Sequence, residues 1–326
     1  MNSIKLRARS AALISALFCL AACGNSSSST PHAGAAQDDD ATPAFPPAPA
    51  AGTTGGFDGA CAYKHVEQLV AVGPHSAGTE GIRRAQAYIL AQLQGYGCAV
   101  EEQAFHASTP VGDVSMKNIV AKVPSTSQNI ILYASHYDSK RIADFVGAND
   151  GGSSTGVLLE LARVLCAQRN ADGVWLVFFD GEEAFNFQWA DPDHTYGSKE
   201  LAARLSLSGD LHRVKAMVLM DMVGPTNPLY RRESNSTPWL TDVVWSTAAR
   251  LGYGSVFVNS KNAIEDDHIA FLQRDIPATD IIDFESPVLD YWHTSRDTLD
   301  KIDPRTLAIT GHVMLEALPE IEKKIK

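Results

Sequence analysis

Two adjacent glutamates, Glu182 and Glu183, stand just after an apolar run over residues 174–179. The run predicts a buried strand, because strands that are covered on both faces are apolar at nearly every position. The turn Asp180-Gly181 then brings both carboxylates to the C-terminal edge of the strand, where open α/β sheets hold their active sites. One glutamate can bind a metal ion while its neighbour transfers protons. A solvated acidic turn would be the alternative interpretation if the pair stood alone.

The pair does not stand alone, because other ligand-type side chains also come at the ends of predicted elements. They are His136 and Asp138 after one strand, Asp221 after another, Asp150 before a helix, and His293 in a Tyr-Trp-His-Thr segment. Taken singly, such a histidine is usually a surface residue and such an aspartate is usually an N-cap. Nitrogen and carboxylate ligands without cysteine are typical of a catalytic zinc site, and Asp138 is placed to orient a ligand. Their convergence therefore favours zinc chemistry.

In chain order, these residues resemble the co-catalytic zinc aminopeptidase superfamily. The similarity covers about residue 62 to the C-terminus, and the matching segments are Gly147-Ala148-Asn149-Asp150, Glu182-Glu183, Asp267-His268 and His293-Thr294-Ser295-Arg296-Asp297-Thr298. These segments alone suggest a peptidase.

Three further features resemble one branch of that superfamily, the animal-type glutaminyl-peptide cyclotransferases. The first is the Ser-His-Tyr-Asp-Ser-Lys segment at residues 135–140. The second is an insertion with Trp189 between Glu183 and Gly197, whereas typical aminopeptidases have this Gly-Ser within a few residues of the glutamate pair. The third is Asp266, at a position where peptidases commonly have serine before the Asp-His pair.

The resemblance implies a role for each site residue. Asp150, Glu183 and His293 would bind zinc, and Glu182 would transfer protons. Asp221 and Asp266 would form a hydrogen-bonded carboxylate pair beside Glu182. Trp189, Trp292 and Glu265 would contact the substrate. His136 and Asp221 match the second-metal positions of the peptidases, so the sequence leaves the number of zinc ions open, although the cyclotransferases bind one.

The implied reaction converts the N-terminal glutamine of a peptide to pyroglutamate and releases ammonia. Zinc would polarise the γ-amide carbonyl, and Glu182, with a pKa raised by neighbouring carboxylates, would carry a proton from the attacking amine to the leaving ammonia. A dinuclear zinc aminopeptidase is the first alternative. A lipid-anchored binding protein on an inactive peptidase fold is the second, and the retention of all the ligands argues against it.

Some features depart from the animal pattern. Val288 and Leu289 stand where a pocket aromatic is expected, and the loop between Lys140 and Val146 is shorter. Closure of the substrate pocket is therefore the least secure part of the resemblance.

Alternating strand and helix patterns predict a single α/β domain with a mostly parallel central sheet covered by helices on both faces. The predicted strands are residues 100–105, 117–123, 129–134, 174–179, 215–220, 255–258 and 278–283, and the predicted helices are 63–72, 81–93, 153–167, 198–205, 239–251 and 304–324.

The N-terminal region carries a targeting pattern. Residues 1–22 resemble a bacterial lipoprotein signal peptide, with basic residues before a short apolar stretch and a Leu-Ala-Ala-Cys end, and an ordinary secretory signal is the alternative. We expect lipidation of Cys23 and, because Gly24 is not aspartate, anchoring in the outer membrane facing the periplasm. Residues 23–56 predict a disordered Ser/Ala/Pro/Gly tether, and 57–326 a zinc-dependent catalytic domain.

Export permits a disulfide. We predict a Cys61–Cys98 bridge, with Cys166 free and buried on a helix; three reduced cysteines are the alternative.

The net charge of −11 argues against a nucleic acid partner. The expected partners are peptides or proteins with N-terminal glutamine, the expected membrane contact is the lipid anchor alone, and we expect a monomer.

Overall fold

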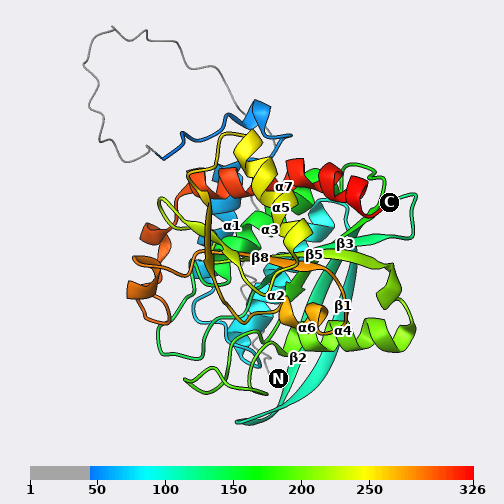
Figure 1. Ribbon diagram of the computed structural model, residues 1–326. Helices are drawn as coiled ribbons and strands as arrows, with labels where there is room; N and C mark the ends of the chain where they lie inside the picture. Colours follow the sequence, from blue (N-terminus) through cyan, green and yellow to red (C-terminus); the bar gives the residue numbers. More distant parts are fainter. Residues whose placement is uncertain (1–44) are drawn as a thin grey trace, which may run out of the picture. The chain divides into compact units, whose positions relative to one another are not determined.

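The computed structural model describes residues 45–326 (Figure 1). Among these residues, six strands form the central sheet, in the order β1-β2-β4-β3-β5-β8. The strands are β1 (Ala99–Thr109), β2 (Gly112–Val123), β3 (Ile130–His136), β4 (Gly173–Phe179), β5 (Val214–Asp221) and β8 (Ala278–Ile282). The pairs β4–β3, β3–β5 and β5–β8 are parallel, and the β1–β2 hairpin joins β4 antiparallel. The parallel part brings the C-terminal ends of β3, β4 and β5 to one edge.

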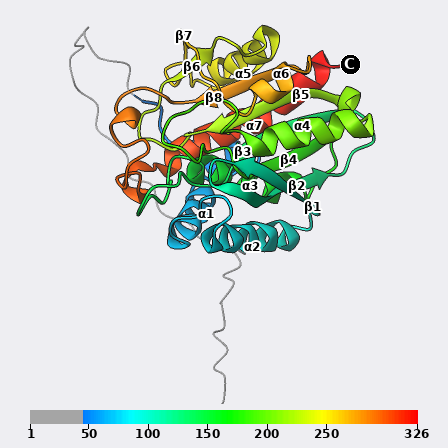
Figure 2. The same cartoon turned by 90° about the horizontal axis from the view of Figure 1, so that it is seen from below.

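Helices cover both faces of this sheet, as the sequence predicts. One face packs against α1 (Gly59–Ala71), α2 (Glu80–Gly95), α3 (Gly152–Leu165), α5 (Pro238–Arg250) and α7 (Pro304–Lys324). The other face packs against α4 (Tyr196–Ser208) and the short α6 (Ile269–Leu272). Figure 2 shows α1 and α2 on one side of the strands and α4 on the other.

The apolar character of the central strands follows from this double cover. Along β3, Ile131 and Tyr133 belong to the core under α1 and α3, whereas Leu132 and Ala134 belong to the core under α4. All four side chains are fully buried. Successive strand residues point to opposite faces, so a strand with two buried faces carries no alternating polar residues.

A two-stranded sheet, β6 (Tyr230–Glu233) paired parallel with β7 (Phe257–Asn262), lies outside the central sheet. The sequence predicts β7 in part but predicts neither β6 nor α6. The β6 sequence Tyr-Arg-Arg-Glu is short and charged and has no strand pattern of its own. Its pairing is therefore a tertiary effect.

The predicted signal peptide and the first part of the predicted tether fall outside the described residues. The rest of that tether, from Phe45, includes the 3₁₀ helix η1 (Ala51–Thr53). Phe45 packs against the core and lies 4.1 Å from the Arg305 guanidinium, and Thr54 is fully buried. Packed structure thus extends upstream of Phe57. Among residues 45–326, no helix combines the length and apolar character needed to cross a membrane.

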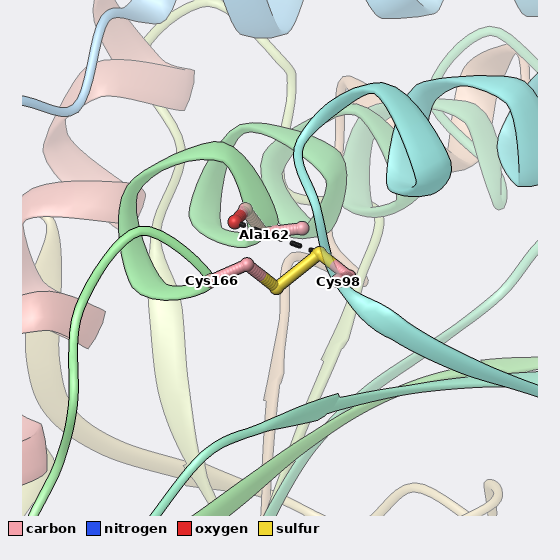
Figure 3. Close-up of a disulfide and its surroundings, with 3 residues drawn as sticks. All are labelled: Cys98, Ala162 and Cys166. Atoms are coloured by element: carbon pink, nitrogen blue, oxygen red, sulfur yellow. Dashed lines mark hydrogen bonds between the residues drawn. A yellow bond between two sulfur atoms is a disulfide. The ribbon is translucent and has the colours of Figure 1, made fainter.

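The predicted Cys61–Cys98 bridge is wrong, because the disulfide joins Cys98 to Cys166 (Figure 3). Their Cα atoms are 5.2 Å apart although 68 residues separate them in sequence. Cys166 is the C-cap of α3, and this helix end lies beside the α2–β1 connection, where Cys98 Sγ is also 3.9 Å from the Ala162 carbonyl oxygen. The prediction relied on chain order along α1 and α2, which gives no information about the position of α3.

Replacing Cys166 by serine is expected to lower the free energy of unfolding by about 2–5 kcal/mol, because the bridge restricts a long loop of the unfolded chain. Urea unfolding of the oxidised proteins measures this loss. Cys61→Ser is the matched control and should leave the unfolding midpoint and the Cys98–Cys166 peptide in a non-reducing digest unchanged. A larger loss in Cys61→Ser than in Cys166→Ser would contradict the pairing.

Candidate active site

The predicted site residues meet at the C-terminal edge of the parallel strands. His136 and Asp221 are the last residues of β3 and β5, and Glu182 and Glu183 follow β4 after a two-residue turn. Gly151 immediately precedes α3 and has a φ of 75°. A Cβ at this position would approach His136 Cε1 to 2.8 Å. The sequence uses glycine where backbone must pass close to the His136 ring.

Three predicted zinc ligands, Asp150, Glu183 and His293, form a compact cluster. His293 Nε2 lies 3.3 Å from Asp150 Oδ2 and 3.3 Å from Glu183 Oε1. Asp150 Oδ2 and both carboxylate oxygens of Glu183 are buried and accept no hydrogen bond from residues 45–326. Buried carboxylate oxygens without donors are costly unless a cation satisfies them. The set of two carboxylates and one imidazole fits the three protein ligands of a catalytic zinc site.

His136 and Asp221, which match second-metal positions, form a second group together with Asp150. His136 Nε2 lies 3.1 Å from Asp221 Oδ1 and 3.3 Å from Asp150 Oδ1. The opposite ring nitrogen, Nδ1, lies 3.1 Å from the Asp138 carbonyl oxygen. Burial alone would lower the pKa of His136, but Glu182 and Asp221 raise it well above its usual value.

Two further carboxylates hold the backbone that carries the ligands. The Asp138 carboxylate accepts hydrogen bonds from the backbone N–H groups of Glu182 at 3.0 Å and Glu183 at 3.3 Å. The Asp297 carboxylate accepts from the N–H groups of Asn149 at 2.8 Å and Asp150 at 3.0 Å. The sequence predicts an orienting role for Asp138. It does not predict the role of Asp297, whose only signal is its place in the segment that begins at His293.

Lys140 is a second residue whose role the sequence does not reveal. Its side chain is 2% exposed, and its Nζ lies 3.5 Å from Glu183 Oε2. A buried ammonium beside a ligand carboxylate offsets part of the negative charge of the cluster.

A pocket of about 270 Å³ opens above the cluster. Its walls include the predicted substrate-contact residues Trp189, Trp292 and Glu265. The Trp292 ring stacks on His293 at 3.8 Å, and Phe284 meets Trp292 edge-on at 4.8 Å. Phe284 therefore supplies an aromatic wall that the sequence analysis did not assign.

Val288 and Leu289 thus do not leave the pocket without aromatic packing. Val288 is fully buried under the Trp292 wall with Met222 and Tyr291, whereas Leu289 is 42% exposed. The resemblance led us to expect an aromatic side chain at one of these two positions, and its absence made pocket closure insecure. Phe284, upstream of them, provides the missing ring.

Glu182 lies beside the three-ligand cluster and lines the same pocket. Burial raises the pKa of Glu182 well above its usual value, and Asp266 and Glu183 raise it further against the opposing effect of His136. The expected contribution of neighbouring carboxylates is present but ranks below burial. Burial and Asp221 likewise raise the pKa of Asp266 to about 7. A carboxyl group with a pKa near neutrality can both accept and return a proton.

The predicted hydrogen bond between Asp221 and Asp266 does not form within the described structure. Asp221 Oδ1 instead accepts from the Met222 N–H at 2.7 Å and faces His136. Asp266 Oδ1 accepts from the Asp267 N–H at 2.5 Å, and its Oδ2 accepts no hydrogen bond from residues 45–326. The Asp221 carboxylate acts on Asp266 through its charge, which raises the pKa of Asp266.

Residues 118–318 match peptidase family M28. The chain belongs to this family. It is 31% identical over 261 residues to a glutaminyl-peptide cyclotransferase of Drosophila melanogaster, and the match covers 72% of this chain and 73% of the fly protein. The crystal structure of a glutaminyl cyclase from an Acidobacteriales bacterium superposes with a TM-score of 0.78 at 35% identity, covering 89% of this chain and 100% of that one. A Zn-dependent exopeptidase from Parabacteroides distasonis gives a TM-score of 0.74 at 29% identity, covering 80% and 97%.

In this M28 chain, a buried carboxylate also positions the segment that carries Glu265 and Asp266. Glu233 accepts from the N–H groups of Ser236 at 2.7 Å and Ile264 at 3.2 Å, and lies 3.1 Å from His268 Nε2. Burial would raise the pKa of Glu233, but His268 and the N–H groups of Asn235 and Ile264 lower it to about 2. The ionised carboxylate therefore holds β6 and the 264–268 segment together.

Replacing Glu233 by glutamine is expected to lower the free energy of unfolding at pH 7 by about 3 kcal/mol. The folded pKa of about 2 lies below the usual 4.5, so this stabilisation is complete above pH 4.5 and is lost as the pH falls toward 2. Urea unfolding at pH 7, 5 and 4 measures the difference, which should shrink at the lowest pH. Glu316→Gln is the matched control, because its exposed pair with Arg250 contributes about 1 kcal/mol or less. An equal loss in both variants would contradict this role.

Proposed function

We propose that the chain is a zinc-dependent glutaminyl-peptide cyclotransferase, which converts the N-terminal glutamine of peptides to pyroglutamate and releases ammonia. The observation that carries this proposal is the placement of Glu182 in a pocket walled by Trp189 and Trp292, directly above the Asp150, Glu183 and His293 cluster. The cyclotransferases and glutaminyl cyclases among its relatives support the same activity.

The reaction forms a bond between the α-amine and the side-chain amide carbon of the same glutamine and breaks the bond from that carbon to the amide nitrogen. Bound zinc supplies Lewis-acid polarisation of the amide oxygen. Glu182 takes a proton from the attacking amine and donates one to the departing ammonia, so the residue ends as it began. The high pKa of Glu182 suits both steps.

The aromatic walls position the substrate and limit water. Trp189 and Trp292 enclose a glutamine side chain in the curled conformation that brings its amine to the amide carbon. Exclusion of water from that carbon suppresses the competing hydrolysis. Glu265 lies at the pocket wall. We assign its carboxylate a contact with the substrate.

One zinc ion is proposed, held by Asp150, Glu183 and His293. Each ring nitrogen of His136 lies within hydrogen-bonding distance of an acceptor, Nδ1 of the Asp138 carbonyl oxygen and Nε2 of Asp221 Oδ1, which supports this number. Elemental analysis should give one tightly held zinc per chain. Two tightly held ions, one of which is lost when His136 is replaced, would contradict this number.

The activity is tested with a dipeptide that begins with glutamine. Purified protein is incubated with the dipeptide, and ammonia and free amino acids are measured together with the mass of the product. Ammonia release with an intact pyroglutamyl dipeptide is expected. Free amino acids without ammonia would instead identify an aminopeptidase and overturn the proposal.

The predicted location is a separate proposal that rests on the sequence pattern at residues 20–24. We propose that Cys23 is lipidated and tethers the catalytic domain to the outer membrane on its periplasmic face. Mass spectrometry of the protein from membrane fractions should detect a lipid on Cys23, and Cys23→Ser should release the protein from the membrane fraction. Unchanged membrane association of that variant would contradict the anchor.

A further inference from the structure

A third group of metal-type side chains lies at the mouth of the pocket, apart from the two groups of the catalytic cluster. Asp191, His194 and Glu265 each offer one ligand atom, and these atoms all lie within 4.8 Å of one another. Asp191 and His194 belong to the insertion between Glu183 and α4, whereas Glu265 comes from the segment before α6. The group therefore spans the opening between two segments that are far apart in sequence.

His194 is the residue that points to a ligand. It is 2% exposed, and its Nδ1 lies 3.0 Å from Thr195 Oγ1. Its Nε2 faces Asp191 Oδ1 at 3.2 Å, yet this buried nitrogen makes no hydrogen bond with residues 45–326. One ring nitrogen held by a neighbour, with the other aimed into a carboxylate pair, is the usual arrangement of a metal-binding histidine.

The surroundings of His194 favour its neutral, metal-binding form. Burial, and then the Lys199 ammonium, lower the pKa of His194. The ring also stacks on the Trp189 indole, with centroids 4.2 Å apart and planes 20° apart. The stacking fixes the ring orientation and connects the group directly to a wall of the catalytic pocket.

We propose that Asp191, His194 and Glu265 form a second metal site, for a divalent transition ion such as Zn²⁺, at the mouth of the catalytic pocket. One imidazole and two carboxylates without a thiolate are ligands suited to zinc, cobalt or nickel. An ion there joins the insertion to the segment before α6 beside Trp189. It also engages the Glu265 carboxylate, so that Glu265 no longer contacts substrate.

Occupancy of this site therefore raises KM for peptide substrates at zinc concentrations above those that fill the catalytic site. This kinetic consequence rests on the proposed cyclotransferase function, whereas the metal site itself does not. The site would act as an inhibitory zinc sensor.

Lys199 opposes metal binding, so substitutions of Lys199 and of Asp191 should change the metal affinity in opposite directions. Its Nζ lies 3.0 Å from Asp191 Oδ1 and 3.0 Å from the His194 carbonyl oxygen. This ammonium occupies the Asp191 carboxylate that the metal ion requires. Lys199→Met should therefore tighten metal binding, and Asp191→Asn should weaken it.

The test is equilibrium dialysis of the full chain, with its catalytic zinc in place, against increasing Zn²⁺, followed by elemental analysis. The wild type is expected to bind one more zinc than Asp191→Asn at the same free concentration, with a midpoint lower by about tenfold or more. Lys199→Met should move the midpoint the other way. Asp242→Asn is the matched control, because Asp242 is 69% exposed and paired with Arg232 much as Asp191 is 71% exposed and paired with Lys199.

Identical zinc-binding curves for the wild type and Asp191→Asn would overturn the site. The wild type and all the variants keep His136, so any extra ion bound there contributes equally to each curve and does not affect the comparison. In the kinetic arm, excess zinc should raise KM for a glutamine dipeptide in the wild type but not in Asp191→Asn, whose activity without added zinc should be normal. A constant KM despite the extra bound ion would overturn the inhibitory role, and absence of any ammonia release would concern the proposed function alone.

Discussion

Replacing Glu182 by glutamine is expected to lower kcat by about 10²–10⁴, the usual loss when a general acid–base group is removed. Glutamine has nearly the same shape but cannot carry the proton between amine and ammonia. Zinc content should remain unchanged, since the proposed ligands are Asp150, Glu183 and His293. Ammonia release and elemental analysis on the same preparation measure both properties.

The comparison variant is Glu183→Gln, the neighbouring residue on the same turn. It should lose zinc as well as activity, because both oxygens of Glu183 are buried and without donors among residues 45–326. Both variants keep the backbone N–H groups that Asp138 holds. Near-normal turnover in Glu182→Gln would show that Glu182 is not the proton-transfer residue. Loss of zinc from Glu182→Gln would instead identify Glu182 as a zinc ligand.

Replacing Asp150 by asparagine is expected to abolish zinc retention and to lower activity by about 10³, which corresponds to the several kcal/mol that a Lewis acid contributes to a transition state. Asp150 contributes Oδ2, 3.3 Å from His293 Nε2, to the cluster. Zinc at about 1,000 times its dissociation constant stabilises a protein by about 4 kcal/mol. Thermal unfolding with and without a chelator should show this stabilisation in the wild type and lose it in Asp150→Asn.

Asp144→Asn is the matched control for that experiment. Asp144 lies on the same loop, is exposed, and has a φ of 59° that asparagine also tolerates. It should retain zinc, activity and the chelator-dependent shift in unfolding temperature. Zinc retention in Asp150→Asn equal to that of Asp144→Asn would contradict the assigned ligand set.

The sequence predicts the site well where local order determines it. Glu182, Asp221 and His136 each follow an apolar strand, and parallel strands must present their C-terminal ends together. The resemblance to cyclotransferases then adds Trp189, which no local pattern distinguishes from an ordinary core tryptophan. The fold follows from the same alternation of strands and helices.

Features that depend on distant packing could not be predicted. Phe284 becomes a pocket wall only through its T-shaped packing against Trp292, and Lys140 becomes a partner of Glu183 only after β3 and β4 pair. Three cysteines allow three pairings, and the correct one required the position of the α3 end. Asp221 and Asp266 are close as expected, but the hydrogen bonds of each were decided by the nearest backbone N–H groups.

The Asp297 carboxylate, which receives the N–H groups of Asn149 and Asp150, also affects when the site can form during synthesis. Asp150, a proposed zinc ligand, lies near the middle of the chain. Its neighbour His293 and its anchor Asp297 are among the last residues to leave the ribosome before α7. A nascent chain that has not yet reached His293 therefore has no complete zinc site. Metal loading, and with it peptide cyclisation, begins only after nearly the whole chain has emerged.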